Sequence, residues 1–257
     1  MTRLLFDQFS KNLLGGLLPD GGAVQQGYTL SSEVKEVDIL FQPDPDKISS
    51  LQGLGLLGRM VEQFCLIEPY RNPVSTVEVQ VCLGRAIEVG LHQRREAKQN
   101  QIPAKQVVLP HLWILSPTVS EAVLEGFGAR QTQQWGKGVY VLPESLRTAI
   151  VVIHQLPVTL DTLVLRLLGR GAVQNQAIAE LLALSTAESF RKVCLYHLAK
   201  LQLTMKTRQK LSKDDRELID TLQPAYEEWE RETIEKGRQE GIEQDFNSCW
   251  RELCLCC

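Results

Sequence analysis

Two acidic residues, Asp38 and Glu68, lie within or directly after short apolar stretches of the sequence. Such stretches are typical of strands, so the two carboxylates could meet on neighbouring strands of one sheet. A buried carboxylate costs free energy unless a positive group compensates it, and a divalent cation is the natural compensator. Mg²⁺ or Mn²⁺ held by such a pair can activate water for phosphodiester cleavage. The alternative interpretation is a pair of solvent-exposed acids at strand ends.

The first element that could add to this pair is an amphipathic helix. Apolar residues at helical spacing predict a helix over residues 1–18 that ends near Gly15 and Gly16. Asp7 and Lys11 lie four positions apart on its polar side.

The acids themselves are placed on two predicted strands. Apolar and polar residues alternate over 34–41, which predicts a strand containing Asp38. Residues 64–67 form a short apolar run before Glu68, as in a buried strand. The pattern further predicts helices over 77–95 and 119–127 and strands over 112–115, 139–142 and 149–153. This alternation of strands and helices indicates a mixed α/β sheet.

The chain changes character after Pro157. Apolar residues at every third or fourth position predict helices over 160–184 and 188–211. We therefore expect an α/β core over 1–157, a helical subdomain over 158–211, and a charged C-terminal helix and tail over 212–257.

The C-terminal part of the chain holds most of the acidity. Ser212 is a predicted helix N-cap with acidic residues after it, and the helix should continue through Tyr226 and Trp229. Residues 206–252 have a net charge of −4, compared with −3 for the whole chain. This charge pattern is typical of a solvated helix or of a coiled-coil surface.

Composition restricts the class of protein. The chain has 257 residues, of which 44% are hydrophobic and 23% charged, so a fully disordered or collagen-like protein is excluded. The net charge of −3 does not indicate a general polyanion-binding surface, although it does not exclude a local basic groove. No apolar run approaches the roughly 18 residues needed to span a bilayer, and we expect a cytoplasmic protein without a membrane role. Four of the 7 cysteines lie in the last nine residues, and their spacing is not that of paired zinc ligands.

The order of these features resembles a known nuclease superfamily. Asp7 in the opening helix, the strand over 36–41, the segment over 64–70 and the Gly-Arg-Gln-Glu-Gly sequence at 237–241 are similar to recombination-promoting nucleases and transposase-like proteins of the PD-(D/E)XK superfamily. The stretch over 65–184 is also similar to a family of uncharacterised cyanobacterial proteins. The resemblance covers most of the chain. It implies a restriction-endonuclease-like core, a mixed sheet flanked by helices with a C-terminal helical extension, and Mg²⁺-dependent cleavage of DNA.

The resemblance assigns roles to four residues. Asp38 matches the metal-binding aspartate of the second motif, Glu68 matches the acid of the (D/E)-x-K motif, and Asp7 is a further metal ligand from the opening helix. Tyr70 stands where the pattern requires Lys or Gln. A tyrosine hydroxyl carries no positive charge at neutral pH, so stabilisation of the developing negative charge would be reduced and catalytic activity is left open.

Two alternatives could supply the missing Lys or Gln. Arg71 follows Tyr70, but neighbouring residues on a strand point to opposite faces, so we expect Arg71 to point away from the site. Glu78 and Gln80 restore an acid-x-Gln pattern if residues 77–83 form a strand rather than a helix.

Two functions remain in competition. In the first, the protein is a DNA endonuclease in which Tyr70 joins the two acids, and the arginines nearest the site in sequence contact phosphate: Arg59, Arg71, Arg85, Arg94 and Arg95. In the second, it is an interaction or regulatory protein without catalytic activity. That protein would bind a second copy of itself or another protein through its acidic C-terminal helix.

Overall fold

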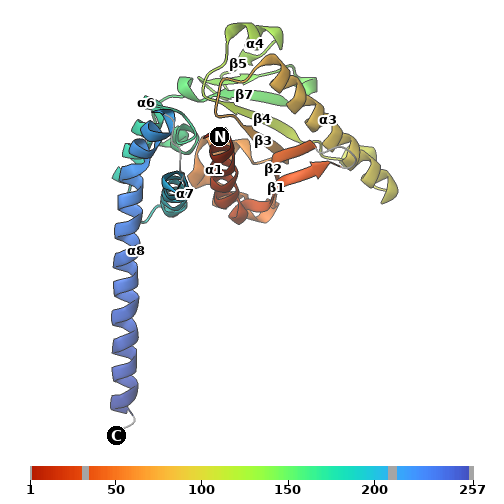
Figure 1. Cartoon of the computed structure of the whole chain (residues 1–257). Helices are drawn as coiled ribbons and strands as arrows, with labels where there is room; N and C mark the ends of the chain where they lie inside the picture. Colours follow the sequence, from red (N-terminus) through yellow and green to blue (C-terminus); the bar gives the residue numbers. More distant parts are fainter. Residues whose placement is uncertain (1, 31–34, 208–212, 255–257) are drawn as a thin grey trace.

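The computed structural model describes residues 2–30, 35–207 and 213–254. Seven strands form one mixed sheet in the order β1-β2-β3-β4-β7-β6-β5 (Figure 1). The strands β1, β2 and β3 are antiparallel, β3, β4 and β7 are parallel, and β6 and β5 continue antiparallel. The α/β class expected from the sequence is confirmed. The strand bounds are β1 Gly22–Leu30, β2 Lys35–Pro43, β3 Cys65–Pro69, β4 His111–Ser116, β5 Arg130–Gln131, β6 Val139–Val141 and β7 Thr148–Val152.

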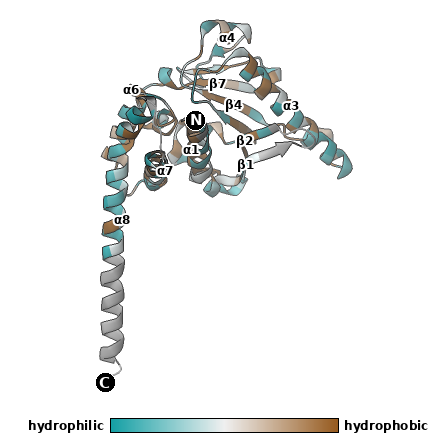
Figure 2. Ribbon diagram, viewed as in Figure 1, coloured by the Kyte–Doolittle hydropathy of each residue, from teal (hydrophilic) through white to brown (hydrophobic). Residues whose placement is uncertain are grey.

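Helices cover both faces of the sheet, as Figure 1 shows. Buried side chains on one face of the sheet pack against α3 and α4, and those on the other face pack against α1, α2 and the C-terminal helices. Brown, hydrophobic positions therefore follow the middle strands in Figure 2. The helix bounds are α1 Thr2–Leu17, α2 Leu56–Met60, α3 Thr76–Gln99, α4 Glu121–Gly126, α5 Leu163–Arg166, α6 Ala172–Ala183, α7 Ser189–Lys206 and α8 Lys213–Cys254.

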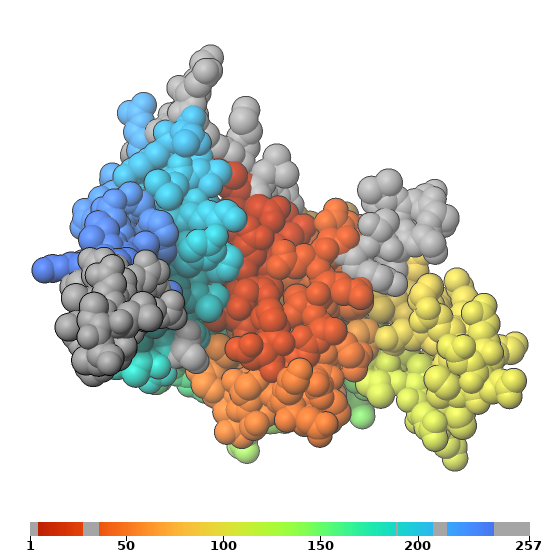
Figure 3. Space-filling model, turned by 90° about the horizontal axis from the view of Figure 1, so that it is seen from below, coloured from red at the N-terminus to blue at the C-terminus, as the bar shows by residue number. Residues whose placement is uncertain are grey.

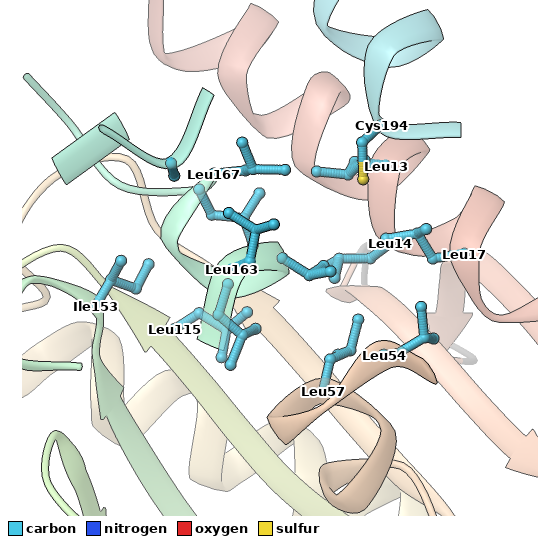
Figure 4. Packing of buried hydrophobic residues seen from close by; sticks show 14 of the residues in the cluster. Leu13, Leu14, Leu17, Leu54, Leu57, Leu115, Ile153, Leu163, Leu167 and Cys194 are labelled. Carbon is cyan, nitrogen blue, oxygen red and sulfur yellow. The ribbon is translucent and has the colours of Figure 1, made fainter. Parts of the chain in front are cut away.

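The N-terminal helix α1 lies between the sheet and the C-terminal helices. Leu13 and Leu14 are fully buried and meet Leu163 and Cys194 in the core shown in Figure 4. The space-filling view confirms this position, because the red and orange N-terminal residues lie between the cyan and blue C-terminal helices and the yellow α3 (Figure 3).

The helix predicted over 1–18 is confirmed as α1, which ends at Leu17, directly after Gly15 and Gly16. A Cβ atom at Gly15 would lie 1.7 Å from the side chain of Gln26 in β1, and one at Gly16 would lie 2.6 Å from Nε2 of His197 in α7. The two glycines therefore allow α1 to approach its neighbours on two sides.

The helix predicted over 77–95 is confirmed as α3, which begins with a capping box. The side chain of Ser75 accepts a hydrogen bond from the Glu78 backbone, and the Glu78 carboxylate accepts one from the Ser75 backbone at 2.8 Å. The alternative motif through Glu78 and Gln80 needs a strand here. That alternative is wrong, since both residues lie in the first turns of a helix.

The helix predicted over 160–184 is split into α5 and α6. The chain leaves the helical path around Gly171, whose φ of 54° falls in the left-handed region that favours glycine. The long C-terminal helix is confirmed as α8, which passes through Tyr226 and Trp229, while the predicted cap Ser212 lies outside the described residues.

Helix α8 packs against the rest of the molecule through residues in its first half. Leu218, Leu222 and Ala225 are buried, and the Arg191 guanidinium in α7 holds α8 by ion pairs with Glu228 and Glu232. The remainder of α8 runs well past the rest of the molecule (Figure 1). Among the described residues, no helix is long and apolar enough to cross a membrane.

Candidate functional site

Asp38 and Glu68 lie side by side at the edge where β2 and β3 separate. The two strands pair antiparallel up to Ile39 and Ile67, and the next residue on each strand is the acid. Both acids line one polar cavity of about 170 Å³. Asp7 from α1 lines the same cavity, so the structure brings together the three carboxylates that the sequence analysis singled out.

Lys11 in α1 is the cation closest to Asp38. Its Nζ lies 2.7 Å from Asp38 Oδ1 and 3.2 Å from Asp7 Oδ2. Burial acts to lower the pKa of Lys11, but the hydrogen bond and the charge of Asp38 outweigh it, so the pKa is raised and the amine stays charged. Burial has the opposite effect on an acid: it raises the pKa of Asp38, and the hydrogen bond and charge of Lys11 oppose this shift.

Glu68 is the most buried acid of the site, with 1% of its surface exposed. Arg85 in α3 donates a hydrogen bond from Nη1 to Glu68 Oε2 at 2.9 Å. The other oxygen, Oε1, is buried and accepts no hydrogen bond from a described residue. Burial, followed by the charge of Asp38, raises the pKa of Glu68 to about 8 despite Arg85. This shift favours the protonated form of the Glu68 carboxyl, and a further cation beside it would favour the ionised form.

Tyr70 and Arg71 both line the cavity. The expectation that Arg71 points away is therefore wrong. Strand β3 ends at Pro69, so the alternation of side chains no longer applies to the two residues that follow. The Arg71 guanidinium lies 4.5 Å from the ring centre of Phe6, a cation–π contact that connects this turn to α1.

The Tyr70 hydroxyl points to a neutral partner. It lies 3.1 Å from Cys82 Sγ in α3, and burial raises the pKa of the tyrosine, so the hydroxyl stays protonated. Tyr70 therefore supplies no positive charge to the cavity.

Three of the arginines expected to contact nucleic acid lie elsewhere. Arg59 in α2 forms a two-pronged ion pair with Asp161, at 2.6 and 3.0 Å. Arg94 and Arg95 lie more than two turns beyond Arg85 along α3, and they line no part of this cavity. Nearness in sequence did not predict which arginines lie at the site, because the later residues of α3 lie far from the ends of β2 and β3.

Lys11 is the residue that the sequence analysis missed. The pattern contained a signal, since Asp7 and Lys11 are four positions apart, but that spacing is usual on solvated helices. Only the packing of α1 against β2 distinguishes the two cases, and this packing depends on contacts far apart in the chain.

The site's capacity for a metal follows from its donors. Among the described residues, no group of three His, Cys, Asp or Glu side chains is close enough to hold a metal ion by itself. Two hard carboxylates, one with a buried oxygen that accepts no hydrogen bond, nevertheless fit Mg²⁺, which usually takes one or two protein carboxylates and completes its shell with water and substrate phosphate.

Comparison of the chain with protein-family models, with curated proteins and with solved structures gives no match.

Proposed function

We propose that the protein is a Mg²⁺-dependent DNA endonuclease of the PD-(D/E)XK type with a restriction-endonuclease-like core. The order of elements supports this proposal. A helix precedes three antiparallel strands, and α3 then crosses over to a strand parallel to β3. The motif acids lie on the second and third of these strands, as the resemblance implies.

The observation that carries the proposal is the convergence of Asp38 and Glu68 on one cavity. Each acid lies at the end of its paired segment, and both face the same 170 Å³ space together with Asp7. Asp38 and Glu68 would hold the cation, whereas Asp7, which pairs with Lys11, lies too far away to complete a group of three ligands, contrary to the sequence prediction. A bound Mg²⁺ supplies polarisation of the phosphate and acidification of a water molecule.

The side chains of the protein supply the remaining charge stabilisation. Tyr70 stands in place of the motif lysine, but Lys11 and Arg85 bring two permanent positive charges to the same carboxylates from α1 and α3. Positive groups fixed beside a phosphate stabilise the negative charge that develops on its oxygens. We assign this role to Lys11 and Arg85 jointly.

A plasmid-nicking assay with Mg²⁺ or Mn²⁺ tests the proposal. The natural chain should convert supercoiled plasmid to the nicked form, and Asp38→Asn and Glu68→Gln should each abolish this conversion. Glu62→Gln, an exposed acid outside the cavity, is the matched control and should cut like the natural chain. Nicking that persists in both site variants would overturn the proposal.

A second function is favoured by a different observation. Lys11 and Arg85 already neutralise the two acids, which is also how a protein without metal would keep them buried. Such a protein would act through the projecting part of α8, by binding a second copy of the chain or a protein partner.

This second function is tested by shortening α8. Ending the chain after Thr233 keeps Leu218, Leu222, Ala225 and both partners of Arg191, so the packed part of the helix is preserved. Light scattering should show fewer copies per particle for the shortened chain than for the full chain if the projecting part joins two copies. The same number of copies for both chains counts against self-association.

A further inference from the structure

A larger cavity adjoins the acidic cavity. Its volume is about 820 Å³, within the range of about 300–1,000 Å³ that is usual for sites binding small organic molecules. It lies between the turn after β3, the turn before α6, and the first half of α8. Arg71 lines both cavities, so the two spaces meet at this side chain.

One end of the large cavity is positively charged. Arg71 and Arg170 line it, and Arg170 is held in place by two hydrogen bonds. Its Nη1 donates to Asn72 Oδ1 at 2.9 Å, and its backbone N–H donates to His154 Nε2 at 3.2 Å. Two guanidinium groups therefore lie beside the turn that follows Glu68, and guanidinium groups are suited to binding phosphate.

The rest of the cavity is chemically different. Ile178 and Leu182 from α6 and Leu218 from α8 supply apolar lining, and Glu217 and Asp220 from α8 add two carboxylates. A nucleotide has groups that match each of these, namely a phosphate for the arginines, flat rings that bury on apolar surface, and ring N–H groups that donate to carboxylates.

The wall formed by α8 is held firmly. Arg191, whose side chain is 2% exposed, pairs with Glu228 and Glu232 further along α8. A base that is stacked and paired inside a duplex cannot enter a walled cavity of this kind without leaving the stack, and this costs a few kcal/mol, roughly, per base. An unpaired base does not carry this cost.

We infer that the 820 Å³ cavity binds one unpaired nucleotide of a DNA strand, next to the phosphodiester held at Asp38 and Glu68. The choice of the adjacent phosphodiester rests on the proposed endonuclease function, whereas nucleotide binding in the cavity does not. The cavity gives the protein a preference for single-stranded or unpaired DNA.

Fluorescence anisotropy with a labelled single-stranded oligonucleotide, in EDTA so that no cleavage occurs, tests the inference. Ala179→Trp on the cavity wall fills the space, and Ala183→Trp, one turn further along α6 and outside the cavity, is its matched control. Arg170→Gln removes one charge, and Arg95→Gln, an exposed arginine outside both cavities, is the control for that loss. Thermal unfolding checks that all four variants fold.

We expect Ala179→Trp and Arg170→Gln to weaken binding about tenfold or more, which corresponds to about 1.4 kcal/mol, while both controls stay within about twofold. The duplex of the same sequence should bind more weakly than the single strand. Equal binding by Ala179→Trp and Ala183→Trp, or duplex binding as tight as single-strand binding, overturns the inference. So does binding of free deoxynucleoside monophosphates without binding of the oligonucleotide.

The two proposals can fail separately. Asp38→Asn and Glu68→Gln leave the large cavity intact, so they should bind the oligonucleotide like the natural chain even though they do not cut. Cavity-dependent binding without any nicking removes the endonuclease function and keeps the nucleotide site. Nicking by the natural chain, together with unchanged oligonucleotide binding by Ala179→Trp, keeps the endonuclease function and removes the nucleotide site.

Discussion

The Nζ atom of Lys11 lies 2.7 Å from Oδ1 of Asp38, across the contact between α1 and β2. Both side chains are largely shielded, with 13% and 16% of their surfaces exposed. A pair in this environment is screened far less than a surface ion pair, so removal of one partner leaves the other charge poorly solvated. The first prediction follows from this relationship.

Lys11→Gln should lower the free energy of unfolding by about 1–3 kcal/mol, because Asp38 loses its charged partner. Urea denaturation measures this change. Lys47→Gln is the control, since Lys47 pairs with Asp44 at 3.5 Å on an exposed surface and should contribute less than about 0.5 kcal/mol. The double variant Lys11→Gln/Asp38→Asn should recover part of the loss. If the losses of unfolding free energy in Lys11→Gln and Asp38→Asn simply add in the double variant, Lys11 and Asp38 are not energetically coupled.

Arg85 and Tyr70 should differ in their effect on nicking. Arg85→Gln removes a positive charge from Glu68 and should slow nicking about tenfold or more, whereas Tyr70→Phe removes only a neutral hydroxyl that faces Cys82. We expect Tyr70→Phe to nick within about twofold of the natural chain. Initial rates on supercoiled plasmid in Mg²⁺ provide the measurement. An equal loss in both variants would give Tyr70 a role that its neutral contact does not explain.

Gly58 in α2 should tolerate no side chain. A Cβ atom there would lie 2.1 Å from the backbone carbonyl oxygen of Leu51, so Gly58→Ala should destabilise the protein by about 1–3 kcal/mol. Gly84 in α3 is the matched control, because a Cβ atom there meets nothing within 4 Å. Gly84→Ala should stabilise the protein by up to about 1 kcal/mol through helix propensity. Thermal unfolding should show a lower melting temperature for Gly58→Ala and a higher one for Gly84→Ala. Equal changes of melting temperature in the two variants would refute the proposed clash at Gly58.

His111 should make stability depend on pH. Its ring packs against Trp113 with centroids 4.5 Å apart, and burial, followed by the charge of Arg147, lowers its pKa from 6.5 to about 4. Between these two values the unfolded chain binds more protons than the folded chain, so stability falls as pH falls from about 6.5 to about 4.

His111→Leu should remove this contribution, which approaches about 1.4 kcal/mol per pH unit within that window. Urea denaturation at several pH values measures it as the difference between the natural chain and the variant. His92→Gln, at a more exposed position in α3, is the control. A slope unchanged by His111→Leu would show that other groups account for the loss in acid.

The elements with strong periodicity were predictable from the sequence. The strand over 34–41 and the helix over 77–95 correspond to β2 and α3, because alternation and helical spacing reflect burial on one face. Strand β1 was missed, since Gly22–Leu30 contains two glutamines and two glycines and lies at the edge of the sheet, where no second partner imposes a buried pattern.

The candidate site was predictable only in part. Asp38 and Glu68 follow apolar strands, so their placement could be inferred from local pattern. Of the cations beside them, Arg85 was among the five arginines expected near the site, but its pairing with Glu68 and the role of Lys11 could not be inferred, because both side chains come from helices whose orientation is set by packing on the sheet. The split between α5 and α6 was missed for a related reason, since one glycine with positive φ interrupts an otherwise continuous apolar pattern.

The contact of Gly16 with His197 has a consequence for protein synthesis. The helix that carries Asp7 and Lys11 leaves the ribosome well before Ser189–Lys206, which forms part of the surface that holds it. The packing of α1 against α7 therefore forms only after α7 has emerged, so the surroundings of Asp7 and Lys11 are completed late in synthesis.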